Sequence, residues 1–254
     1  MSKYSILSSK AITRYMEDGE IVIHPFNPHN LNTSSYDVTL GKYYFREQNN
    51  KDEYVSNIYN IYSEEHVKRV WGNPLEAKPY SYYKKQGVHL ENIHDDELII
   101  FINPGERILG HTNEFIGGRT TVTTMMKARS STGRNFISVC LCAGMGDIGY
   151  YNRWTMEITN NSTNYKIPLV VGRRYAQIVF MDTEGIYTNG NNTEDNTENI
   201  LNNSYNKDDC YSKTGKYQTV DDLEELEKKW SPYDMLPKMY LDREITTYDP
   251  FDMV

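Results

Sequence analysis

The stretch Trp154-Thr155-Met156-Glu157-Ile158 alternates apolar and polar side chains. A period of two residues is typical of a β-strand with one buried face, because successive side chains point to opposite sides of the sheet. The three apolar residues are therefore expected to face a core, with Thr155 and Glu157 on the opposite side. The stretch predicts a β-strand that carries a carboxylate within an otherwise apolar run.

Similar short segments lie on both sides of this strand and are separated by turns. The strand candidates are residues 20–23, 35–41, 98–102, 106–111, 120–126, 136–142, 154–159, 167–171 and 175–181. Short strands at this spacing predict an all-β sandwich or barrel. Two longer helices are expected: residues 10–17, with Ser8 and Ser9 as candidate caps, and residues 221–230, with Thr219 as the candidate cap.

The composition excludes several classes of protein. The chain has 254 residues, a net charge of -8 and no run of basic residues, so a nucleic-acid polymer is not expected as a partner. Its three cysteines lack a paired spacing, which argues against a disulfide framework. No apolar run reaches the length of a membrane span, and the first residues lack a signal-peptide pattern. We therefore expect a soluble, cytoplasmic protein without a membrane partner.

A candidate phosphate site begins at Arg129-Ser130-Ser131, which precedes a stretch that can form one helical turn. Two hydroxyl groups, free backbone N–H groups and an arginine fork together suit a phosphate. A plainer interpretation is open at this point: Ser130 caps a turn, while Arg129 and Arg134 pair with surface carboxylates.

Two carboxylates are candidates for chemistry. If the outer face of its strand lines a pocket, desolvation would raise the pKa of Glu157 and suit it to general base work. If that face meets solvent, Glu157 is an ordinary exposed residue of a strand. Asp147 stands in the preceding turn, where it could hold a sugar hydroxyl or a water, or serve only the turn.

The motifs in combination are more specific than any one of them. Between residues 98 and 181, and again near the N-terminus, the chain resembles the dCTP deaminase branch of the trimeric dUTPase-like family. The segments that carry the resemblance are Leu31-Asn32 with residues 35–41, Asn103-Pro104-Gly105-Glu106, Ala128-Arg129-Ser130-Ser131 with Arg134, Ala143-Gly144 with Asp147 and Gly149, Glu157 with Asn160, and Gly172 with residues 176–180.

The resemblance implies a mainly β fold: a distorted β-barrel of the dUTPase-like type with short peripheral helices, assembled as a homotrimer with active sites at subunit boundaries. It implies Glu157 as the general base. It also implies that Ser130 and the backbone of Ala143 position the attacking water, and that Arg134 holds Glu157 and stabilises developing charge.

The same resemblance implies a set of substrate contacts. Arg129, Ser130 and Ser131 would bind the phosphates, and Asp147 and Tyr150 would meet the deoxyribose. A C-terminal phosphate lid would include Lys216 and Gln218. Two features depart from the family pattern: the turn at residues 146–152 lacks the usual proline, and Val220 replaces the last glutamine of the lid.

The leading hypothesis for function is hydrolytic deamination of dCTP to dUTP and ammonia in pyrimidine deoxynucleotide metabolism. The alternatives are a bifunctional enzyme that continues to dUMP and pyrophosphate, a dUTPase alone, and a non-catalytic, nucleotide-binding regulatory barrel. Mg²⁺ is expected only as the ion chelated by the substrate triphosphate, and dTTP is a candidate feedback inhibitor. No zinc site is expected, because His89-Leu90-Glu91 lacks the Pro-Cys-x-x-Cys that completes the site of zinc deaminases.

The domain organisation is predicted from shifts in composition. We expect a barrel domain over residues 1–220, with an insertion at about 46–96 and a flexible loop at about 184–207. A C-terminal extension is expected over residues 221–254.

Overall fold

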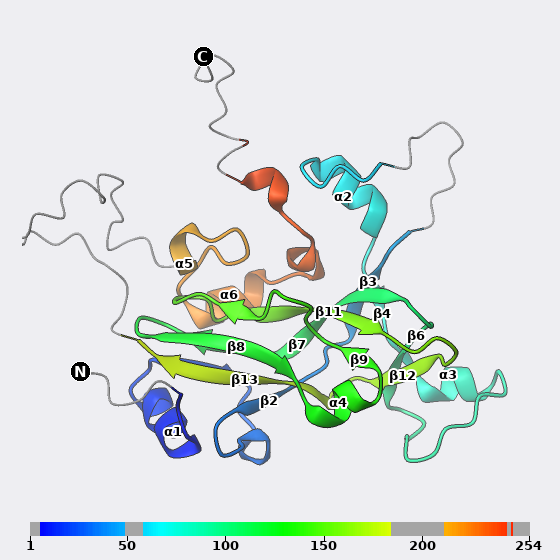
Figure 1. The fold of residues 1–254 in the computed structure, drawn as a ribbon, viewed down its shortest axis with the longest axis horizontal. Helices are drawn as coiled ribbons and strands as arrows, with labels where there is room; N and C mark the ends of the chain where they lie inside the picture. Colours follow the sequence, from blue (N-terminus) through cyan, green and yellow to red (C-terminus); the bar gives the residue numbers. More distant parts are fainter. Residues whose placement is uncertain (1–5, 49–57, 184–210, 243–244, 246–254) are drawn as a thin grey trace, which may run out of the picture.

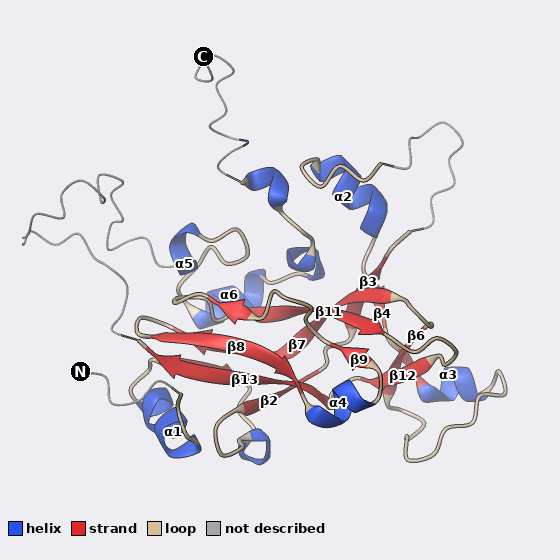
Figure 2. Cartoon of the chain, viewed as in Figure 1, coloured by secondary structure: helices blue, strands red, loops and turns tan. Residues whose placement is uncertain are grey.

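The computed structural model describes residues 6–48, 58–183, 211–242 and 245. Its strands form three antiparallel sheets, and its helices lie around them (Figures 1 and 2). The mainly β architecture expected from the alternating segments is thus confirmed, and the antiparallel ladders divide among the three sheets.

The largest sheet is built around β7 (Arg107–Gly118) and β11 (Arg153–Asn160), which pair antiparallel. Its other strands are β1 (Ile21–His24), β3 (Tyr43–Arg46), β4 (Leu75–Glu76) and β9 (Ile137–Ser138). The second sheet contains, in spatial order, β10 (Met145–Gly146), β8 (Val122–Ala128), β13 (Arg174–Asp182) and β2 (Tyr36–Thr39). The third contains β12 (Ile167–Val170), β6 (Leu98–Ile102) and β5 (Lys78–Pro79).

The helices are short. The α-helices are α1 (Ser9–Glu17), α2 (Glu64–Trp71), α3 (Tyr80–Lys84), α4 (Ser130–Arg134), α5 (Tyr211–Thr214) and α6 (Leu223–Lys229), and 3-10 turns span Pro28–Asn30, Pro232–Met235 and Met239–Leu241. Helix α1 confirms the helix expected at residues 10–17. The expected cap of the C-terminal helix is wrong: Asp222 caps α6 in place of Thr219, because its carboxylate accepts the Glu225 N–H at 2.8 Å.

The main core uses the inward faces of the strands, as the alternation predicts. Trp154, Met156 and Ile158 are buried, and the side chains between them belong to the other face of β11. The indole N–H of Trp154 donates to the Ile116 carbonyl at 2.8 Å, so its polar atom is also satisfied inside the core. The strand that carries Glu157 is therefore fixed by packing along its whole inner side.

One expectation about local structure is wrong. Residues 136–142 are not one strand: Phe136 has a φ of 66°, only Ile137 and Ser138 pair as β9, and the chain then leaves the ladder. The described residues of the segment expected as an insertion form α2, α3, β4 and β5. Ser63 caps α2 by accepting the His66 N–H at 3.3 Å, and β4 and β5 extend two of the sheets.

The proposed division into a domain of residues 1–220 and an extension of 221–254 stays a prediction. The loop expected at 184–207 falls outside the described residues, as do residues 49–57 of the insertion and 246–254 of the extension.

A buried histidine, His111 of β7, lies between the segment of Gly41 and Tyr43 and the ring of Trp230. The His111 Nδ1–H donates to the Thr112 carbonyl at 2.8 Å, while Nε2 accepts the Tyr43 N–H at 3.3 Å. The ring packs against the Trp230 ring with centroids 4.7 Å apart, and a Cβ on Gly41 would come within 1.9 Å of it. An imidazole that accepts at Nε2 must be neutral, and burial lowers its pKa to about 4.

Acidification should therefore destabilise the fold through His111. In the unfolded chain the imidazole takes up a proton near pH 6.5, whereas in the folded chain it does so only near pH 4. Its contribution to the free energy of unfolding is thus complete above pH 6.5 and falls by about 3 kcal/mol as the pH drops to 4. Urea unfolding of the wild type and of His111→Gln at several pH values measures this contribution of His111 to the free energy of unfolding. Parallel pH profiles for the two proteins would contradict the assignment.

Candidate active site

A cavity of about 430 Å³, here called the Glu157 cavity, lies against the outer face of β7 and β11. Its floor is formed by the strand residues Arg107, Leu109, Trp154, Thr155 and Glu157. The segment around β10 supplies Ala143, Met145, Gly146, Asp147 and Tyr150, and the rest of the wall is Trp71, Tyr211, Tyr217, Met235 and Pro237. Of the two interpretations of Glu157, the structure supports the one in which its face of the strand lines a pocket.

The environment of Glu157 favours its protonated form. Burial raises the pKa of this carboxyl group, and Oε2 is shielded from solvent without a hydrogen-bond partner among the described residues. The positive charge of Arg107 acts in the opposite direction and lowers the pKa. A carboxylate whose pKa is moved toward neutrality by burial is suited to both accept and return a proton.

Arg107 is a residue that the sequence reasoning misses. It lies opposite Thr159 in the β7–β11 ladder, and its Nε donates to Thr159 Oγ1 at 3.3 Å. Because side chains two apart on one strand share a face, this pairing places Arg107 on the Glu157 side of the sheet. In the sequence, Arg107 is only a basic residue at the start of an expected strand. That position does not distinguish an arginine of a site from one on the surface.

The turn before β11 brings Asp147 and Tyr150 to the same cavity. The Asp147 carbonyl accepts the Tyr150 N–H at 3.0 Å, and Gly149 takes the positive φ of 91° that the turn requires. Asp147 is exposed and its carboxylate is accessible to a ligand. The Tyr150 hydroxyl donates to the Arg153 carbonyl at 3.0 Å, and burial raises the pKa of the phenol, which therefore stays neutral.

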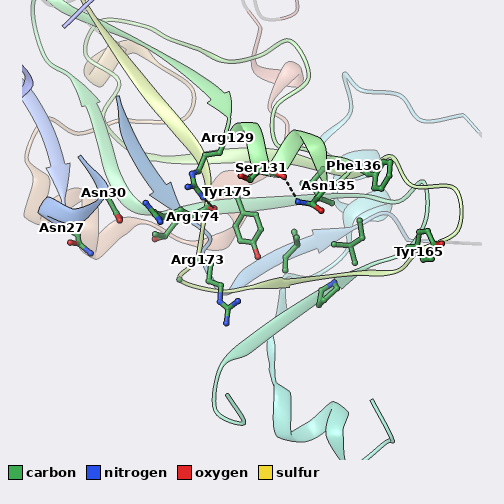
Figure 3. Close-up of a pocket in the computed structure, with 17 residues that line it drawn as sticks. Asn27, Asn30, Arg129, Ser131, Asn135, Phe136, Tyr165, Arg173, Arg174 and Tyr175 are labelled. Atoms are coloured by element: carbon green, nitrogen blue, oxygen red, sulfur yellow. Dashed lines mark hydrogen bonds between the residues drawn. The ribbon is translucent and has the colours of Figure 1, made fainter. Parts of the chain in front are cut away.

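A second cavity of about 770 Å³, here called the arginine hollow, contains the candidate phosphate residues (Figure 3). Arg129 and Ser131 line it together with Arg173, Arg174 and Tyr175. Asn27, Asn135, Phe136 and Tyr165 form its outer parts (Figure 3).

Two of the three arginines of this hollow, Arg129 and Arg174, are held by one buried carboxylate, and Arg173 pairs with Glu97 at 3.0 Å. Asp37 Oδ2 lies 3.0 Å from Arg129 Nε and 3.1 Å from Arg174 Nη1, and Oδ1 accepts from Asn32 Nδ2 at 2.9 Å. The Asp37 side chain is only 3% exposed. The plainer interpretation of Arg129, a pair with a surface carboxylate, is therefore wrong in one respect, because the carboxylate is buried. The pair fixes the direction of the guanidinium groups at the edge of the hollow.

Within a single chain the predicted catalytic residues are not gathered in one place. Glu157, Ala143, Asp147 and Tyr150 share the Glu157 cavity, whereas Arg129 and Ser131 line the arginine hollow. Ser130 and Arg134 are exposed on α4 and line neither cavity. Their expected roles stay predictions.

Lys216 and Gln218 have structural contacts in this chain. Gln218 is buried; its Oε1 accepts the Tyr151 N–H at 2.9 Å and its Nε2 donates to the Gly149 carbonyl at 3.0 Å. Lys216 forms an ion pair with Asp242. These contacts join the C-terminal segment to the turn that carries Asp147, and the expected lid role of both residues stays a prediction.

No group of three or more His, Cys, Asp or Glu side chains is arranged to hold a metal ion in the part of the chain that the structure describes. No described helix is long and apolar enough to cross a bilayer.

Comparisons with known proteins agree with the motifs. The family model described as dCTP deaminase-like matches residues 6–183, and the chain therefore belongs to the dCTP deaminase-like family. The "dCTP deaminase, dUMP-forming" of Hydrogenobaculum sp. (strain Y04AAS1) is 29% identical over 181 residues, covering 71% of this chain and 84% of that protein. The protein of the same name from Methanocaldococcus jannaschii is 28% identical over 179 residues, covering 69% and 81%.

A solved structure is also similar. The 2'-deoxycytidine 5'-triphosphate deaminase from Agrobacterium tumefaciens matches with a TM-score of 0.49 and 15% sequence identity, over 71% of this chain. The match spans 50% of that chain.

Replacing Gln218 by leucine should destabilise the protein. The substitution keeps the volume but removes the two hydrogen bonds that the buried amide makes, to the Tyr151 N–H and to the Gly149 carbonyl, which costs about 1–3 kcal/mol of unfolding free energy. Gln86 is exposed, so Gln86→Leu is a matched control that should change stability by less than about 0.5 kcal/mol. Urea unfolding of both variants tests this. Equal stabilities would mean that the buried amide does not hold the C-terminal segment.

Proposed function

We propose that this protein hydrolyses dCTP in two steps, first to dUTP and ammonia and then to dUMP and pyrophosphate. The main support for the second step is that the relatives similar over most of their length carry the name "dCTP deaminase, dUMP-forming". Deamination to dUTP alone is the leading expectation from the sequence, and the names of the relatives favour the bifunctional reaction instead. The presence of Glu157 and Asp147 in one cavity is compatible with both steps.

In the deamination step, Glu157 would act as the general base. Its carboxylate would take a proton from a water molecule whose oxygen adds to C4 of the cytosine ring, and would return a proton to the amino group that leaves as ammonia. One water molecule is consumed, and the carboxylate is regenerated. The raised pKa that burial gives this group supports the assignment, since proton transfer is efficient when the pKa lies near the working pH.

In the second step, another water molecule would attack the α-phosphorus of dUTP, and pyrophosphate would leave. Asp147, whose carboxylate is exposed in the cavity, is the residue that we assign to the deoxyribose and to this water. Mg²⁺ chelated by the triphosphate would supply positive charge against the phosphate oxygens. Arg129, Ser130 and Ser131 would bind the triphosphate.

We further propose that the complete site forms between copies of the chain in a homotrimer. The charged residues that line the Glu157 cavity are Arg107, Asp147 and Glu157, a poor environment for a triphosphate. The arginine hollow carries three arginines but no counterpart of Glu157. A neighbour that brings Ser130, Arg129 and Arg134 to the Glu157 cavity would join the two halves, as the family resemblance implies. Inhibition by dTTP stays a prediction.

Two other functions are less well supported. A dUTPase alone or a non-catalytic nucleotide-binding barrel has no use for a buried carboxylate, one oxygen of which has no hydrogen-bond partner among the described residues. Burying such a group costs stability, which favours a role in the reaction for Glu157.

The reaction and its base are tested together by product analysis. Purified protein with dCTP and Mg²⁺ should release ammonia and yield dUMP and pyrophosphate, which anion-exchange chromatography separates from dCTP and dUTP. Glu157→Gln should lower the deamination rate by about 10²–10⁴-fold while nucleotide binding persists, because the amide cannot accept the proton. Glu91→Gln, at an exposed glutamate, is the control and should be fully active. Accumulating dUTP would limit the function to deamination, and unchanged dCTP would contradict it.

The shared site is tested by mixing two inactive variants. If the arginines and the base come from different copies, co-expressed Arg129→Gln and Glu157→Gln chains should restore about one site in four in random trimers. If both residues act within one chain, no mixed assembly contains an intact site. Deamination rates of the mixture and of each variant alone, together with the mass from light scattering, distinguish the two arrangements.

A further inference from the structure

Part of the Glu157 cavity is walled by two segments that the sequence analysis leaves without a function. Trp71 is the last residue of α2, which belongs to the insertion. Met235 and Pro237 belong to the C-terminal segment, beyond the residues that the family model matches. Figure 1 shows α2 and the C-terminal segment on the same side of β3 and β11.

The two segments support each other through one apolar cluster. Val67 of α2, Leu109 of β7 and Met235 are buried together with Phe45 and Leu236, and Trp71 packs against them. The contact also has a polar component, because the Tyr233 hydroxyl donates to Asn73 Oδ1 at 3.1 Å. The wall above Glu157 is therefore a packed structure and not a loose flap.

The C-terminal part of the wall is anchored next to the cavity as well. The Tyr217 hydroxyl accepts the Lys238 N–H at 3.0 Å, and the Tyr217 carbonyl accepts from Asn152 Nδ2 at 2.8 Å. Tyr217 itself lines the cavity. Pro237 is thus held between Met235, which is in the apolar cluster, and a backbone hydrogen bond at Lys238.

The chemistry of this wall suits a nucleobase better than a phosphate. Trp71, Leu109, Met235 and Pro237 offer apolar and aromatic surface, and the two carboxylates of the cavity would repel phosphate oxygens. Carboxylates accept hydrogen bonds from an exocyclic amino group such as that of cytosine.

We propose that Trp71, Met235 and Pro237 are specificity-determining residues that form the apolar wall against which the pyrimidine ring of the substrate packs. The inference rests on the proposed function, since it assumes that a cytosine nucleotide enters the Glu157 cavity. It gives the insertion and the C-terminal segment one shared role: together they build the base-binding half of the site. The ring would lie between this wall and Glu157, with the apolar and aromatic side chains of the wall packed against its face.

Substitutions at Trp71 test the proposal, because a wall that only binds the base should affect KM much more than kcat. Trp71→Ala should raise KM for dCTP by about tenfold or more, with a much smaller change in kcat, because base stacking is lost. Trp71→Phe, which keeps most of the packing, should raise KM less and serves if the alanine variant does not fold. The inhibition constant of deoxycytidine, which has the base but no phosphate, should rise by the same factor as KM. That of inorganic tripolyphosphate should not change.

Tyr62→Ala is the matched control, since Tyr62 is an exposed aromatic residue of the same insertion and does not line the cavity. Its kinetic constants should equal those of the wild type. The proposal is overturned if both Trp71 variants fold and keep the wild-type KM, or if the constants for deoxycytidine and tripolyphosphate rise together. Failure of the proposed function is a separate result, because the wild type itself would then leave dCTP unchanged.

Discussion

The pairing of β11 with β7 is the constraint on which both the core and the candidate site depend. Glu157 lies opposite Leu109, and its neighbours Met156 and Ile158 fill the core. A slip of one residue would expose the apolar side chains and bury the carboxylate in their place, at a cost that no local interaction could offset. The hydrophobic effect that sets the register therefore also sets the direction of Glu157. The ladder is irregular between Arg153 and Thr155, and beyond that point it is in register through the site.

Features that depend on local periodicity could be predicted from the sequence. The strand at residues 98–102 coincides with β6, and the two faces of β11 follow from alternation alone. The prediction of strands and helices fails where the backbone conformation or a single tertiary contact determines the local structure. The chain leaves the ladder after Ser138 although the next residues look suitable for a strand, and α2 forms in a tyrosine-rich, charged segment whose apolar pattern is irregular. In both cases the tertiary context outweighs the local preference.

The composition of the candidate site was predictable only in part, because its contacts join distant segments. The resemblance points to Glu157, Asp147 and Tyr150, and these three do share a cavity. It gives no indication of Arg107 or Trp71, whose relevance arises from a neighbouring strand and from a helix of the insertion. It also does not reveal that Asp37 holds Arg129 and Arg174, since that pairing exists only once β2 and β13 are side by side.

The separation of the arginine hollow from the Glu157 cavity has an electrostatic consequence for the proposed reaction. A triphosphate next to Glu157 would raise the pKa of that carboxyl group further, because like charges disfavour ionisation, and burial already acts in this direction. A base that stays protonated at the working pH cannot accept a proton from water. Holding the phosphates at arginines that Asp37 orients, while the neutral ring enters the cavity of Glu157 and Arg107, keeps the repulsion small. On this argument, the distribution of charge between the two cavities is itself a condition for Glu157 to act as the base.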